Sequence, residues 1–130
     1  MAINAELAEL IRDALESLGS ISIRRMFSGA GVFCDGLMLA LIVGDELYLK
    51  ADAASIPEFE AEGLEPFRYA TKEGERTLSS YWRAPERLLD EPDEMLAWGR
   101  KAFEAARRAA KAQARSATKS PRPRRTKAAR

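Results

Sequence analysis

The sequence contains no histidine and a single cysteine, Cys34. Histidine is the commonest general base and metal ligand near neutral pH, so its absence argues against the usual hydrolytic and metal-dependent mechanisms. A lone cysteine forms no intrachain disulfide, and without a nearby base it is typical of a small apolar strand residue in a reducing compartment. We therefore expect a non-enzymatic, cytoplasmic protein with no metal and no cofactor.

Long apolar runs are also missing. None approaches the roughly 20 residues of a membrane-spanning helix, and the acidic start MAINAELAEL lacks the basic and apolar regions of a signal peptide. With 130 residues, of which 46% are hydrophobic and 32% charged, the chain has room for one soluble domain with a buried core. We expect no membrane partner.

The net charge of +1 conceals an uneven distribution. Residues 1–99 carry nine Lys/Arg and nineteen Asp/Glu, a net −10, whereas residues 100–130 carry twelve Lys/Arg and one Glu, a net +11. An acidic body followed by a basic end indicates either an arm that binds polyanions or a solubilising tail.

Apolar periodicity and turn residues predict the order of the elements. Six strands are expected, at Ile21–Phe27, Gly31–Cys34, Leu37–Val43, Glu46–Lys50, Phe67–Thr71 and Thr77–Arg83. The expected helices are Ala5–Leu18 with Asn4 as its cap, a short crossover helix after Asp52, a small helix after Pro85, and a final helix from Pro92 to about Ala114.

Two segments have more specific expectations. The strand Leu37–Val43 is apolar throughout, which is typical of a central strand covered on both faces. The segment Gly29-Ala30-Gly31 is expected to form a turn; it leads toward a strand, whereas phosphate-binding loops lead into a helix.

The two tryptophans, Trp82 and Trp98, fall on the apolar stripes of their elements, so we expect both in the core. Beyond Ala114 the apolar pattern disappears, and Pro121 and Pro123 prevent a continuous helix. The expected organisation is an α+β domain at 1–113 and a disordered basic tail at 114–130.

Basic and aromatic residues of several strands form a candidate binding patch. Alternation along the last strand places Tyr81 and Arg83 opposite Leu78 and Trp82. The candidate residues are Arg24, Arg25, Tyr48, Lys50, Tyr81 and Arg83. Arg and Tyr are favoured at binding surfaces, but a solvated sheet face has the same pattern.

The basic end offers a second candidate. It has no aromatic residue after Phe103, so it is suited to weak, nonspecific phosphate binding and not to base readout. The candidate residues are Lys119, Arg122, Arg124, Arg125, Lys127 and Arg130. A purely solubilising tail is the alternative.

Many short motifs occur in one order between Leu18 and Ala106. They are Arg25-Met26-Phe27, Gly29, Gly31, Asp35-Gly36, Leu47-Tyr48-Leu49-Lys50, Asp52, Phe59, Gly63, Pro66-Phe67, Tyr81-Trp82, Pro85 and Trp98. With these motifs the chain resembles the N-terminal domain of the TfoX (Sxy) family of bacterial competence regulators. Ser28 departs from the pattern, since related sequences more often have glycine there.

The resemblance implies a two-layer α+β domain in which helices cover an antiparallel sheet of about five strands, and it brings no catalytic residues. It also implies a regulatory or protein-interaction module linked to transcription, with a transcription factor or another regulator as partner and the sheet face as contact surface. Full-length relatives carry a second, helical domain, in whose place this chain has the basic tail. Two alternatives stay open: a nonspecific nucleic-acid-associated protein using the tail, and a small-molecule-binding protein using the Arg/Tyr patch.

Overall fold

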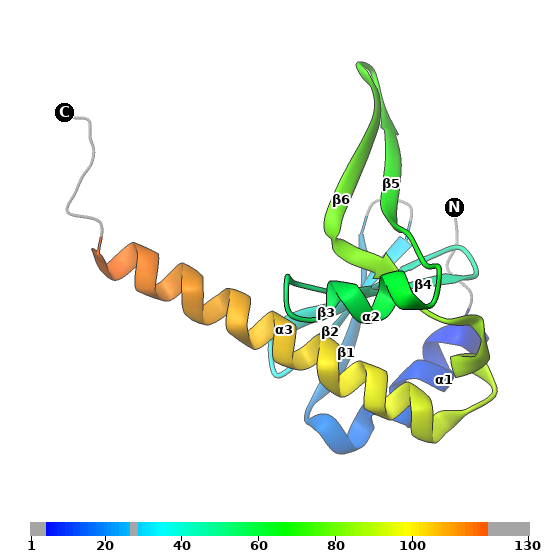
Figure 1. Cartoon of the computed structure of the whole chain (residues 1–130). Helices are drawn as coiled ribbons and strands as arrows, with labels where there is room; N and C mark the ends of the chain where they lie inside the picture. The colour runs from blue at the N-terminus through cyan, green and yellow to red at the C-terminus, as the bar shows by residue number, and fades with distance from the viewer. Residues whose placement is uncertain (1–4, 27–28, 120–130) are drawn as a thin grey trace.

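The computed structural model describes residues 5–26 and 29–119, with side chains up to Ala114 (Figure 1). The helical elements are α1 (Ala5–Leu15), the 3-10 turn η1 (Glu16–Leu18), α2 (Ile56–Ala61), the 3-10 turn η2 (Glu86–Leu89) and α3 (Pro92–Lys119). The strands are β1 (Ile21–Met26), β2 (Gly29–Cys34), β3 (Leu37–Val43), β4 (Glu46–Lys50), β5 (Pro66–Thr71) and β6 (Gly74–Arg83).

The strands form one antiparallel sheet in the order β1-β2-β3-β4-β6-β5. The expected α+β class is confirmed, and all six strands inferred from the residues are present, one more than the resemblance implied. Helix α2 carries the chain from β4 to β5, and β6 then returns between these two strands. The crossover predicted after Asp52 is therefore confirmed.

The helices cover one face of the sheet. Helix α3 packs on β3 and β4, α1 packs on β1 and α3, and Phe59 of α2 contacts the rings of Trp82 and Trp98. Both tryptophans are 8% exposed, which confirms their place in the core. The largest fully buried side chains of this core come from α1, β2, β3, β4, η2 and α3 and include Ile11, Leu15, Val32, Ile42, Leu49, Leu88 and Met95.

The opposite face carries no helix among the described residues, and this corrects the expectation for β3. Ala40 and Ile42 point to the helices and are 0% exposed, whereas Leu41 and Val43, which alternate with them, are only half-buried. An all-apolar strand therefore has one covered face and one open face.

The segment Gly29-Ala30-Gly31 lies within β2 and pairs with both β1 and β3, so the expected turn is wrong. Glycine is required at positions 29 and 31 because a larger residue would collide with neighbouring atoms. A Cβ on Gly29 would lie 2.1 Å from the carbonyl oxygen of Ile42, and a Cβ on Gly31 would lie 2.7 Å from the sulfur of Met38. Neither glycine has a positive φ, unlike Gly36 and Gly44, which lie in the turns on either side of β3.

Two elements extend away from the body (Figure 1). The hairpin of β5 and β6 is longer than expected, because β6 begins at Gly74 and the connection shortens to Lys72-Glu73. Helix α3 continues to Lys119, beyond the end predicted near Ala114, so 114–119 are helical and not disordered. The Asn4 cap, Phe27 and the tail from Ser120 onward lie outside the described residues.

Candidate functional site

The register of five strands brings several of the predicted patch residues onto one row. Arg24 pairs with Gly31, Gly31 with Leu41, Leu41 with Tyr48, and Tyr48 with Arg83. Directly paired residues of an antiparallel sheet project from the same face, so these side chains share the face that the helices leave uncovered. We call this surface the open face. Its side chains are Arg24, Met26, Phe33, Met38, Leu41, Val43, Glu46, Tyr48, Lys50, Tyr81 and Arg83.

Arg25 does not belong to the open face. It pairs with Ala30, which pairs with Ile42, and both of these side chains are buried under the helices. Arg24 and Arg25 are both exposed on the edge strand β1 but project to opposite sides. The structure therefore gathers five of the six predicted patch residues and separates the sixth.

An apolar centre occupies the open face above Gly31. A Cβ at this position would lie within 3.0 Å of Met38, Met26 and Phe33, so these three side chains converge over the glycine. They remain half-buried, and the Arg24 guanidinium lies 5.1 Å from the centroid of the Phe33 ring. The sequence analysis did not predict this centre. Alternation along β1 places Met26 on the same face as Ser22 and Arg24, and this was the indication that the sequence offered.

A series of polar contacts also lies on the open face. The Tyr48 hydroxyl donates a 2.9 Å hydrogen bond to Glu46 Oε1, and Glu46 Oε2 lies 3.4 Å from Arg83 Nη1. Burial and the contact with the Glu46 carboxylate raise the pKa of Tyr48. The neutral phenol therefore holds the carboxylate that also pairs with Arg83.

The aromatic surface extends onto the β5–β6 hairpin. The ring of Tyr48 contacts Phe67 edge-on at 4.9 Å, and Phe67 stacks on Tyr69 at 5.9 Å. Tyr69 is 43% exposed, although it is a large hydrophobic residue.

The expected alternation along β6 holds for Tyr81, Trp82 and Arg83 but not for Leu78. The strand pairing shifts between Pro66 and Phe67, so that Pro66 pairs with Trp82 and Phe67 with Leu78. Because Phe67 contacts Tyr48, Leu78 lies on the side of the open face. Trp82 is in the core, so the two residues do not share a face as predicted.

Tyr81 projects on the open face, but neighbouring side chains cover its ring, which is only 5% exposed. Its hydroxyl donates a 3.3 Å hydrogen bond to the Met38 carbonyl, and the Lys50 ammonium lies 5.1 Å from its ring centroid. Burial raises the pKa of Tyr81 to about 12. The expectation of an exposed Tyr81 is therefore wrong: this ring supports Lys50 and Met38 from below.

Cys34 is fully buried, and burial together with the Asp35 charge raises its thiol pKa. It is the small buried strand residue that the sequence indicated, because nucleophilic cysteines need a lowered pKa and access.

Two hollows lie away from the predicted patch centre. One of about 450 Å³ lies between Leu37 and α3, and one of about 40 Å³ lies between Asp45, Arg83 and Leu89. Neither is lined by Arg24, Tyr48 or Tyr81, so they give no support to a small-molecule site at the patch.

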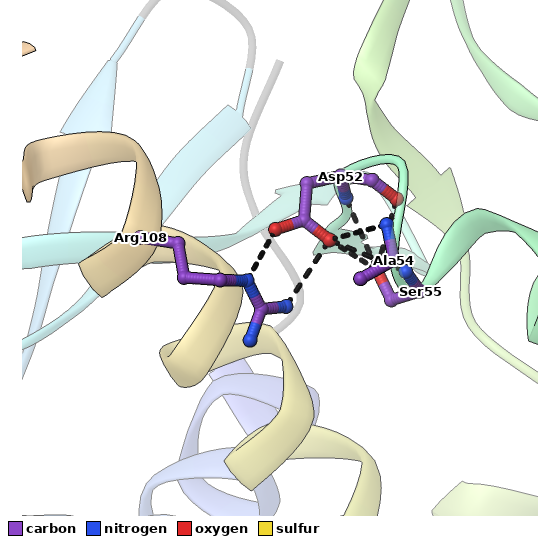
Figure 2. A network of polar contacts seen from close by, with 4 residues as sticks. All are labelled: Asp52, Ala54, Ser55 and Arg108. Atoms are coloured by element: carbon purple, nitrogen blue, oxygen red, sulfur yellow. Dashed lines mark hydrogen bonds and ion pairs between the residues drawn. The ribbon is translucent and has the colours of Figure 1, made fainter. Parts of the chain in front are cut away.

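A polar network fixes α3 to the loop before α2 (Figure 2). Arg108 donates from Nε to Asp52 Oδ2 at 2.6 Å and from Nη2 to Oδ1 at 3.1 Å. The same carboxylate accepts the backbone N–H groups of Ala54 and Ser55, each at 3.2 Å. Asp52 thus organises the turn before α2, while Ser55 is the residue at the helix cap.

The TfoX N-terminal domain family model matches residues 13–106. The match covers most of the 130-residue chain, which therefore belongs to the TfoX N-terminal domain family. No curated protein matches the sequence. In the described part of the chain, no helix is both long and apolar enough to cross a membrane.

Proposed function

We propose that this chain is a non-enzymatic protein-interaction module of transcription regulation, and that the open face is its contact surface. The observation that carries the proposal is the row from Arg24 to Arg83, which aligns basic and aromatic side chains across five strands. The membership of the TfoX N-terminal domain family supports the regulatory role.

The composition of the open face suits a protein partner. Its centre is apolar and holds the flexible side chains of Met26 and Met38, and aromatic residues, Met and Arg are the residue types enriched at protein interfaces. Large apolar patches rimmed by polar groups are uncommon on isolated domains and mark interaction sites. A half-buried apolar centre on a face without a described helix fits this description.

The charges of the open face define the chemistry of the partner. Arg24 lies over Phe33 of the apolar centre, Lys50 and Arg83 lie elsewhere on the open face, and Glu46 is already paired with Arg83. The complementary surface is apolar in its middle and carries carboxylates at its rim. A transcription factor with such a surface is the proposed partner.

Arg24 and Arg25 provide a matched test. Arg24→Glu reverses a charge on the open face, and Arg25→Glu reverses the same charge on the other side of the same edge strand. Each variant is used as bait in its native cell extract, and the captured proteins are quantified by mass spectrometry. We expect a partner that wild type and Arg25→Glu retain and Arg24→Glu loses.

The captured partner is then purified and titrated calorimetrically against all three proteins. A loss of at least about tenfold in affinity for Arg24→Glu, with little change for Arg25→Glu, supports the open face; reversal of a charge facing an opposite charge has effects of this size. A partner that binds both variants equally rules this face out.

A further inference from the structure

The outer part of α3 leaves the body of the protein. Among the residues of this helix up to Ala114, the last buried ones are Ala105 and Ala106, and every residue from Lys111 to Ala114 is exposed. The helix nevertheless continues to Lys119, and Figure 1 shows it projecting past the sheet. Residues 111–114 therefore cover no core.

The charges of the projecting helix are all of one sign. No acidic residue follows Glu104, and ten Lys/Arg occur from Arg107 to Arg130. Five of them fall within α3, at Arg107, Arg108, Lys111, Arg115 and Lys119. At about 100° per residue, these five positions occupy roughly one third of the helix circumference. We call them the basic stripe; the positions between them are mostly alanine.

The positive charges of the basic stripe repel one another. Residues 107, 111, 115 and 119 follow one another at intervals of four, and like charges at this spacing destabilise a helix by about 0.2–0.5 kcal/mol per pair. The negative end of the helix dipole offsets part of this repulsion. Beyond Arg108 the described residues Lys111 to Ala114 are exposed, so burial does not offset the remainder there, and an external polyanion is the group that best satisfies the stripe.

The N-terminal end of the basic stripe contacts the body of the domain. Arg108 is hydrogen bonded to Asp52, and the Arg107 guanidinium lies 5.8 Å from the centroid of the Phe103 ring. The hollow of about 450 Å³ beside Leu37 is lined by Arg107, Arg108 and Lys111 together with Glu104. The basic surface therefore begins on a rigid part of the domain and continues along the free helix.

We propose that the basic stripe of α3 binds the phosphate backbone of double-stranded DNA without reading its sequence. An α-helix with its side chains is about 10–12 Å wide and enters the roughly 12 Å major groove of B-form DNA, and alanines keep this helix slender. The deep, narrow major groove of A-form RNA does not admit it. Single strands are disfavoured because no aromatic residue follows Phe103 to stack on bases.

The binding is expected to be weak and strongly salt-dependent. Nonspecific protein–DNA complexes have dissociation constants of about 10⁻⁴–10⁻⁶ M, and log K falls with log salt by about 0.9 per phosphate neutralised. Residues 1–99 carry a net charge of −10 and oppose the association. Screening over about 8 Å at physiological ionic strength limits that opposition for a projecting helix.

The test measures fluorescence anisotropy of labelled ligands with the full chain at low salt. Two DNA duplexes of unrelated sequence should bind equally, and both should bind more tightly than double-stranded RNA, single-stranded DNA or vesicles containing anionic lipid. Arg107→Gln/Lys111→Gln should lower duplex affinity at least about tenfold and reduce the salt slope by about two. Lys72→Gln/Arg76→Gln removes the same charge from the β5–β6 hairpin and should change the affinity less than about twofold.

A third variant tests whether duplex binding requires the helical structure of the segment or only its charges. Ala112→Pro keeps every charge and interrupts the helix in its exposed part, so it should leave the melting temperature of the body unchanged and weaken duplex binding at least about threefold. Equal binding by Ala112→Pro and wild type, equal losses for the two Gln pairs, or preference for RNA or vesicles would each overturn the proposal.

Discussion

Arg108 and Asp52 lie 56 positions apart in the sequence and form a two-point hydrogen-bonded ion pair between α3 and the loop that precedes α2. The Asp52 side chain is 26% exposed and that of Arg108 is 49% exposed, so solvent screens the pair in part. The same carboxylate also orders the turn into α2 (Figure 2). This contact joins α3 to the loop that precedes α2, in addition to the contact of Trp98 with Phe59 of α2.

The first prediction concerns this pair. Arg108→Gln should lower the free energy of unfolding by about 0.5–1 kcal/mol at neutral pH, the range for a partly exposed ion pair. Denaturant titration measures the change. Arg100→Gln, an exposed substitution on the same helix, is the control and should remain within about 0.5 kcal/mol.

The pH dependence of this difference follows from Asp52. Hydrogen bonding to Arg108 lowers the pKa of the folded Asp52 below its unfolded value of about 3.9. The stabilisation is therefore complete above the unfolded pKa and is lost as the pH falls through the lower, folded pKa. The gap between wild type and Arg108→Gln should shrink in acid, and a gap that stays constant would assign the effect to packing of the arginine stem.

The second prediction concerns the buried phenol of Tyr81. Its pKa of about 12 lies above the unfolded value of about 10, so its contribution to stability is complete below pH 10 and is lost as the pH rises through about 12. An alkaline titration of tyrosinate absorbance should show a late step that is absent in Tyr81→Phe. The same variant should lose about 0.5–1.5 kcal/mol of stability with its hydrogen bond to Met38.

The third prediction compares two glycines of β2. Gly29→Ala places a Cβ against the rigid backbone at Ile42, whereas Gly31→Ala places one against flexible side chains of Met26 and Met38. Gly29→Ala should therefore cost about 2–3 kcal/mol, and Gly31→Ala should cost less, because the methionines move aside. Chemical denaturation of both variants decides the order, and a larger loss for Gly31→Ala would contradict the packing of the open face.

The fourth prediction concerns the aromatic core. Trp98→Ala removes a ring that contacts Phe59 at 5.1 Å and should lower the free energy of unfolding by about 3–5 kcal/mol. Tyr69→Ala removes an exposed ring from the hairpin and should remain within about 0.5–1 kcal/mol. Similar midpoints for Trp98→Ala and wild type would remove Trp98 from the core.

The candidate site was only partly predictable. The sequence analysis grouped Arg24, Tyr48, Lys50 and Arg83, and the strand register places these side chains on one face of the sheet. It did not separate Arg25 from Arg24 or reveal the burial of Tyr81. The separation of Arg25 from Arg24 follows from alternation along β1, so this local signal was overlooked. The burial of Tyr81 depends on Met38 and Lys50, which lie on other strands, and no local pattern contains that information.

The sequence by itself determined the succession of helices and strands, the positive-φ turns at Gly36 and Gly44, and the apolar stripes that hold Trp82 and Trp98. These features arise from residues within a few positions of one another, through periodicity and backbone preference. Only the tertiary structure decided that β6 lies between β4 and β5, that Gly29 and Gly31 lie in a strand and not a turn, and that one sheet face stays open. These outcomes depend on strand register and on close packing between segments that are distant in sequence. The space between two packed elements limits the size of the side chains that either of them can carry.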